Sequence, residues 1–138
     1  MFNLIVSGGD WQPHSDTFPV ERVFEYTDDH LVAQFKPNGV LDINAVRALP
    51  TLFMEEGSGE EIARFGRLTD VRRQGTSYII NYAYDPALPT VTNRRIAEIA
   101  ADLGIADWEF SRTHWAIKSA NIFEAFYRLK SLIQNYRA

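Results

Sequence analysis

Two strand-length runs in the middle of the chain limit the possible folds more than any other pattern. Residues 63–73 and 76–84 alternate apolar and polar side chains, and Gln74 and Gly75 between them are typical of a tight turn. We therefore predict a β-hairpin over residues 63–84. Gly66 lies inside the first run, where a glycine often marks a bend or bulge, so we expect the hairpin to bend there.

The rest of the chain alternates between strand and helix patterns. Apolar runs at residues 2–6 and 51–54 predict two buried strands, and residues 107–118 also read as extended. Helices are predicted where apolar residues recur every three or four positions, with capping residues at their starts: after Thr27, after Asp42, after Thr92 or Asn93, and after Asn121. The last of these is expected to be long, because its apolar stripe runs from Ile122 to Tyr136.

This order of elements predicts an α+β fold with a mainly antiparallel, strongly bent sheet and a long C-terminal helix. The 138 residues suit one domain spanning 1–138, since two smaller domains would each lack a sufficient core. Residues 55–61, rich in glutamate and glycine, are expected to form a mobile loop.

The chain contains no cysteine, which excludes a disulfide scaffold, a cysteine-ligated zinc or iron–sulfur site and a cysteine nucleophile. No apolar run approaches the roughly 20 residues of a membrane span. The first residues lack the basic and apolar regions of a secretory signal. We expect a cytoplasmic protein that does not bind membranes.

The net charge of −4 conceals two opposite halves. Residues 1–63 carry eleven acidic and three basic side chains, whereas residues 64–138 carry seven acidic and eleven basic ones. Such a division is compatible with attraction between the halves within one fold, with association of copies, or with an anionic partner for the basic half.

No metal or cofactor site is predicted. The turn at residues 7–10 follows a strand, but Pro13 stands where a phosphate-binding loop needs the start of a helix. The acidic residues around His30 lack the order of a calcium loop and are explained by the start of a helix. The four glutamates of residues 55–61 sit in a glycine-rich loop that is costly to order around a cation.

Arg112 and His114 are the best candidates for chemistry. They share one face if their segment is extended, and an arginine beside a histidine can bind a phosphate or carboxylate. Pairing of both with acidic residues of the N-terminal half is the favoured interpretation. Because the chain lacks a nucleophile elbow of the Gly-x-Ser-x-Gly type, we assign no catalytic residue.

The hairpin offers a second candidate surface. Four arginines accompany three tyrosines there: Arg64, Arg67, Arg72, Arg73, Tyr78, Tyr82 and Tyr84. Interleaved basic and aromatic side chains on a sheet can bind single-stranded nucleic acid. The tyrosines share one parity and are also suited to the core, and the sequence pI of 5.3 disfavours binding of a polyanion.

Two stretches of the chain, residues 66–71 and 108–118, resemble an uncharacterised bacterial module that precedes effector domains in presumed anti-phage or stress-response proteins. The resemblance extends over about residues 1–126. It implies an accessory or specificity domain, with effector chemistry elsewhere, and transfers no active-site residue.

We therefore predict a non-catalytic binding module that recognises a protein partner or self-associates in the bacterial cytoplasm, without cofactor or metal. The candidate contact residues are Arg67, Arg72, Arg73, Arg112, His114 and Trp115. Two alternatives stay open. One is binding of nucleic acid or a nucleotide through the hairpin, and the other is a small enzyme that uses His114 and Arg112.

Overall fold

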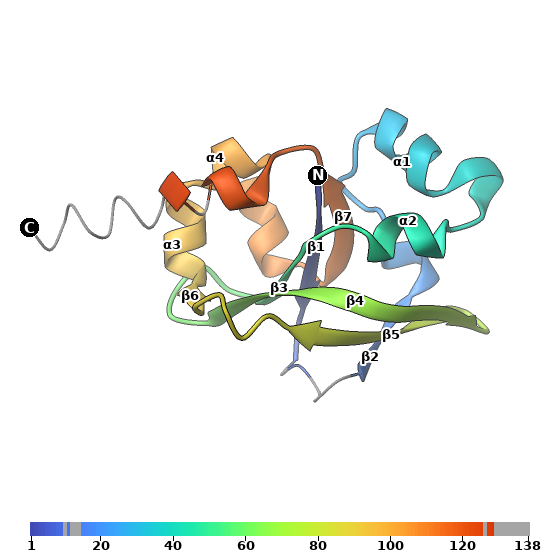
Figure 1. The fold of residues 1–138 in the computed structure, drawn as a ribbon, viewed down its shortest axis with the longest axis horizontal. Coiled ribbons are helices and arrows are strands. Elements are labelled where there is room, and N and C mark those ends of the chain that lie inside the picture. Colours follow the sequence, from blue (N-terminus) through green and yellow to red (C-terminus); the bar gives the residue numbers. More distant parts are fainter. Residues whose placement is uncertain (10, 12–14, 126, 129–138) are drawn as a thin grey trace, which may run out of the picture.

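The centre of the fold is a seven-stranded mixed sheet, seen in a computed structural model that describes residues 1–9, 11, 15–125 and 127–128 (Figure 1). The strands lie in the order β2-β5-β4-β3-β1-β7, and β6 pairs with the start of β4. Their bounds are β1 Phe2–Ser7, β2 Ser15–Pro19, β3 Thr51–Glu55, β4 Ile62–Gln74, β5 Ser77–Tyr84, β6 Val91–Thr92 and β7 His114–Lys118.

Short helices cover the two faces of this sheet (Figure 1). The α-helices are α1 Asp29–Phe35, α2 Ile43–Arg47, α3 Asn93–Glu98 and α4 Ala100–Leu103, and residues 122–125 and 127–128 are also helical. Single 3₁₀ turns occupy Val20–Arg22, Pro37–Gly39 and Asp107–Ser111. None of the helices in the described part of the chain is long and apolar enough to cross a membrane.

The α+β class is confirmed, but the prediction of a mainly antiparallel, strongly bent sheet is wrong. The sheet is mixed and open, because β1 and β3 run parallel at its centre. Parallel neighbours need a long connection, and here that connection carries β2, α1 and α2 between the two strands. Local alternation identifies a strand but does not identify its partner, which is why the sequence pattern missed this pairing.

The prediction of a long C-terminal helix is also wrong for the residues that the structure describes. Helix is present there only at residues 122–125 and 127–128, and the remainder of the expected helix lies outside the described residues. Residues 107–118 are likewise not one extended run, because Asp107–Ser111 forms a 3₁₀ turn before β7 begins. The Glu109 carboxylate accepts a hydrogen bond from the Ala106 N–H at 2.7 Å, which closes this turn.

The hairpin lies where the sequence predicts it, as β4 and β5. Its bulge lies between Leu68 and Asp70 rather than at Gly66. Gly66 instead permits a close approach between the strands: a Cβ atom there would lie well under 3.0 Å from the carbonyl oxygen of Ala83. The glycine is thus required by contact with the neighbouring backbone.

Two hydrophobic cores lie on opposite faces of the sheet. One lies beneath α3 and α4 and includes Leu4, Leu52 and Phe65, whereas the other lies beneath α1 and α2 and includes Ile5 and Phe53. Strands β1, β3 and β7 are therefore buried on both faces, as continuous apolar runs predict. Beyond Phe65, β4 and β5 leave the cover of α3 and α4, and one face of the sheet opens.

Helix ends and loops follow local capping rules. Asp42 caps α2 by accepting a hydrogen bond from Ala45 N, Thr92 caps α3, and Gly104 ends α4 in the left-handed conformation. The loop at residues 55–61, expected to be mobile, makes tertiary hydrogen bonds: Gly57 N donates to Phe110 O at 2.7 Å, and Arg94 N donates to Gly59 O at 2.8 Å.

Candidate binding cleft

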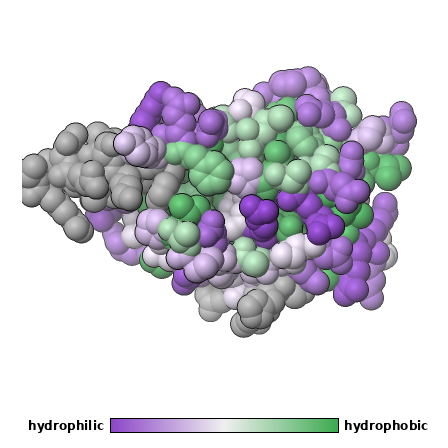
Figure 2. All heavy atoms as spheres, viewed as in Figure 1, coloured by the Kyte–Doolittle hydropathy of each residue, from purple (hydrophilic) through white to green (hydrophobic). Residues whose placement is uncertain are grey.

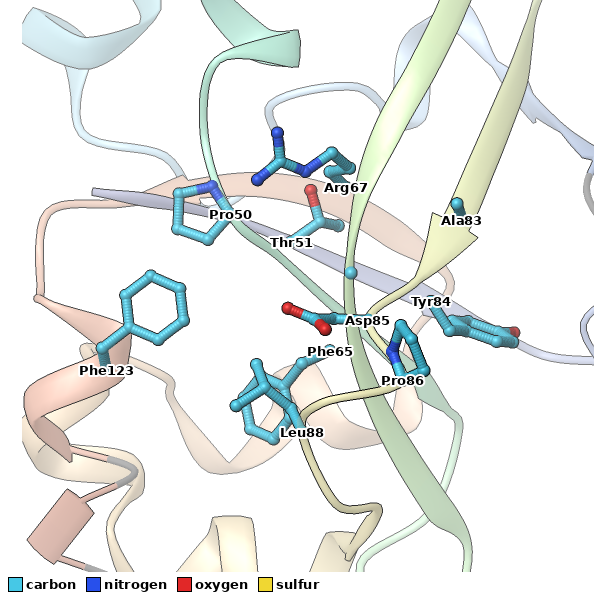
Figure 3. Close-up of a pocket in the computed structure, with 11 residues that line it drawn as sticks. Pro50, Thr51, Phe65, Arg67, Ala83, Tyr84, Asp85, Pro86, Leu88 and Phe123 are labelled. Atoms are coloured by element: carbon cyan, nitrogen blue, oxygen red, sulfur yellow. The ribbon is translucent and has the colours of Figure 1, made fainter.

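A cleft of about 310 Å³ opens where β4 and β5 leave the cover of α3 and α4 (Figure 3). Its floor comes from the start of β3 and the middle of the hairpin, one wall from the loop after β5, and the other wall from Pro50 and Phe123. The lining residues are Pro50, Thr51, Phe65, Gly66, Arg67, Ala83, Tyr84, Asp85, Pro86, Leu88 and Phe123.

Two oppositely charged side chains line this cleft, one from β4 and one from the residue that follows β5 (Figure 3). Ala63 and Phe65 belong to the core beneath α3 and α4, so Arg67, with the same parity in β4, points to the same side of the sheet. Asp85 lies opposite Phe65, since its N–H donates to the Phe65 carbonyl at 2.8 Å. Asp85 Oδ1 accepts from Ala87 N at 2.9 Å.

Apolar side chains form the other part of the lining. Phe123 is 52% exposed and, with Leu88, faces the strand floor across the cleft (Figure 3). Tyr127, one helical turn beyond Phe123, is 73% exposed. Figure 2 shows hydrophobic and strongly hydrophilic side chains meeting over the middle of this face. Apolar walls with a few placed polar groups are the usual lining of a binding site.

Tyr84 lies at the rim of the cleft, and its ring contacts an arginine side chain. The Arg64 guanidinium carbon lies 5.3 Å from the centre of the Tyr84 ring, a cation–π arrangement. Burial raises the pKa of the Tyr84 hydroxyl, with opposing influences from Arg64 and Tyr82. Tyr84 therefore remains a neutral side chain at ordinary pH.

His114 lies away from this cleft, in a buried cluster of charged groups. Its Nε2 lies 3.1 Å from Glu109 Oε1 and its Nδ1 lies 2.6 Å from the Arg112 carbonyl oxygen. Both ring nitrogens of His114 thus lie within hydrogen-bond distance of an acceptor oxygen. The Lys118 ammonium lies 2.8 Å from Glu109 Oε1 and donates to the Tyr26 carbonyl at 2.9 Å.

Glu109 is the centre of this cluster and is only 1% exposed. Burial, the largest single influence, raises the pKa of its carboxyl group. Hydrogen bonds from His114, Lys118 and the Ala106 N–H together outweigh burial, so the pKa of Glu109 is lowered. The carboxylate therefore pairs with the Lys118 ammonium and is hydrogen-bonded to His114 inside the fold. This role explains His114 as a structural residue.

Arg112 pairs with an acidic residue of the N-terminal half, as the favoured interpretation of the sequence holds. Its Nη2 and Nε lie 3.0 and 3.2 Å from Glu25 Oε2, and the hydrogen bonds to Glu25 raise the pKa of the guanidinium. His114 does not follow that expectation, since its partner Glu109 belongs to the C-terminal half. Trp115 is fully buried and donates its indole N–H to Asn3 Oδ1 at 3.0 Å.

The hairpin arginines divide between the two faces of the sheet. Arg67 and Arg72 point to the open face, whereas Arg73 lies near the turn and donates to the Gly75 carbonyl at 3.1 Å. Tyr78 and Tyr82 are buried in the core beneath α1 and α2, on the opposite face from Arg67 and Arg72. The structure thus brings Arg67 to the cleft and pairs Arg64 with the Tyr84 ring, but it places Tyr78 and Tyr82 on the face opposite Arg67 and Arg72.

Sequence reasoning missed Asp85, Leu88 and Phe123 as cleft residues. A signal for Phe123 was present, because it falls beside the apolar stripe that begins at Ile122 instead of on it. An aromatic residue outside the buried stripe is expected to be exposed. No comparable signal marks Asp85, whose place depends on the register between β4 and the end of β5.

The described residues contain no group of three or more histidine or acidic side chains arranged to hold a metal ion. No protein-family model matches the chain, and neither a curated protein nor a solved structure matches it.

Proposed function

We propose that this chain is a non-catalytic binding module that recognises a protein partner through the cleft between the hairpin and Phe123, acting in the cytoplasm. The observation that carries the proposal is an exposed phenylalanine facing a free arginine across a strand floor. Apolar anchors beside an arginine are the composition that protein interfaces favour over other surfaces.

The construction of the cleft supports this proposal. Its floor consists of paired strands rather than loops, and Gly66 permits their close approach. A rigid floor lowers the entropy lost on binding, because few groups have to be ordered. Two of the other candidate residues have internal partners, since Glu25 pairs with Arg112 and Glu109 pairs with His114.

Binding of nucleic acid or a nucleotide is the second candidate. It is favoured by the position of Arg67 and Arg72 on one open face of the sheet. Asp70 lies between them on that face, and the buried tyrosines offer no stacking surface there. We rank it below recognition of a protein.

A matched pair of variants tests the cleft. Phe123→Asp places a charge in the cleft, whereas Val40→Asp places the same charge on an exposed apolar position beside α1 and α2. We expect Phe123→Asp to weaken retention of the cellular partner by about 100-fold, the loss typical of an interface hot spot. Val40→Asp is expected to retain it as the unmodified chain does.

The readout is quantitative mass spectrometry of proteins retained by each variant, together with the mass in solution of each variant. If the partner is a second copy, Phe123→Asp alone becomes monomeric. Equal retention by both variants would refute the proposal. So would a strictly monomeric chain that retains no protein.

A further inference from the structure

We propose that the cleft selects an acidic peptide segment, in which a carboxylate pairs with Arg67 while an adjacent apolar side chain packs against Phe123 and Leu88. This inference rests on the proposed function and names the chemistry of the partner. It follows from the charges in the cleft and from where each one lies.

Arg67 differs from most arginines of the described chain because its guanidinium has no partner there. Several others lie within 3.4 Å of a carboxylate: Arg22, Arg94, Arg95, Arg112 and Arg128. Arg67 projects from a strand that pairs with β5 at Ala83 and, as far as the adjacent Gly66, with β3, so its backbone position is fixed. A planar guanidinium in a fixed place binds a carboxylate through two parallel hydrogen bonds.

The walls of the cleft strengthen such a pair. Phe123, Leu88 and Pro50 are apolar, and a bound segment displaces water from the space between them and Arg67 (Figure 3). An ion pair beside apolar surface is screened less than one in open solvent. The same walls bury the apolar side chain of the segment. One site therefore recognises both the carboxylate and the adjacent apolar side chain.

The Asp85 carboxylate determines the orientation in which the peptide segment binds in the cleft. Its carboxylate points toward the middle of the cleft, away from the Arg67 end (Figure 3), and its Oδ1 already accepts from Ala87 N. A second carboxylate beside Asp85 is repelled, whereas a backbone N–H or a basic side chain is accepted there. The acidic group of the ligand therefore lies at the Arg67 end only.

Three capped peptides test the inference directly. Each has the sequence Leu-X-Gly-Leu, with X as Glu, Gln or Lys, and is titrated into the full ¹⁵N-labelled chain while the amide signals of Gly66, Ala83 and Leu88 are followed. We expect the Glu peptide to bind about tenfold more tightly than the Gln peptide, the effect of one charged contact, and the Lys peptide to bind weakest.

Substitutions of Arg67 test whether this side chain causes the preference for the Glu peptide over the Gln peptide. Arg67→Gln is expected to remove the difference between the Glu and Gln peptides, and Arg67→Lys to restore part of it. Arg94→Gln is the control, since Arg94 pairs with Glu60 outside the cleft, and it is expected to leave the preference unchanged.

Equal binding of the Glu and Gln peptides at the cleft would overturn the inference and leave the proposed function intact. Absence of shifts at the cleft with every peptide would overturn it too, and the Phe123→Asp retention experiment then judges the proposed function separately. An oligothymidylate that shifts the cleft signals more strongly than the Glu peptide, and loses this effect in Arg72→Ala, would replace both proposals with nucleic-acid binding.

Discussion

Replacing Glu109 with Gln is expected to lower the free energy of unfolding by about 3–5 kcal/mol, because it leaves the buried Lys118 ammonium without its counter-charge. Glu109 accepts from His114 at 3.1 Å and pairs with Lys118 at 2.8 Å. Urea unfolding measures the loss. Glu98→Gln, which breaks the exposed pair with Arg95, is the control and is expected to cost about 0.5 kcal/mol or less.

Adding Lys118→Met to Glu109→Gln identifies the cause. If the cost comes from an unpaired buried ammonium, the double variant is more stable than the single one, because one buried cation has been removed. A double variant less stable than Glu109→Gln would show that the cost comes from lost packing instead.

The contribution of Glu109 to the free energy of unfolding is expected to decrease as the pH falls. The pKa of Glu109 is lower in the folded state than its ordinary value of 4.5. The unfolded chain therefore binds more protons in the window below 4.5, and the stabilisation is lost as the pH falls through it. We expect the stability difference between the unmodified chain and Glu109→Gln to shrink below about pH 4.5. A constant difference from pH 7 to pH 3 would contradict this account.

Replacing Gly66 with Ala is expected to destabilise the fold by about 1–3 kcal/mol, the usual cost of overpacking, because the new methyl group meets the backbone of Ala83. Backbone atoms cannot rotate away as a side chain does, so β4 and β5 have to separate. Gly9→Ala is the matched control, since its Cβ would meet nothing within 4 Å. Thermal unfolding compares the two, and equal stability would refute the close approach.

The predictable parts of this fold are the local ones. The hairpin, the Asp42 cap and the Gly104 helix end depend on residues close in the chain, and the sequence pattern locates each of them. The parallel pairing of β1 and β3 depends on residues nearly fifty positions apart and leaves no local pattern. The mixed sheet was missed for this reason.

The candidate site, like the fold, could be predicted from the sequence only in part. Arg112 and Trp115 have side chains suited to binding, but the tertiary structure uses both internally, through Glu25 and Asn3. Arg67 alone among the six predicted contact residues lines the cleft. Its neighbours there come from four separate segments of the chain, and no spacing rule brings such segments together.

Cross-linking from inside the cleft tests the central claim most directly. A photo-reactive phenylalanine analogue is placed at position 123 in cells, and at position 40 as the control. The account predicts light-dependent covalent attachment of one protein partner, or of a second copy of the chain, from position 123 and none from position 40. Attachment of the same protein from position 40, with none from position 123, would contradict it.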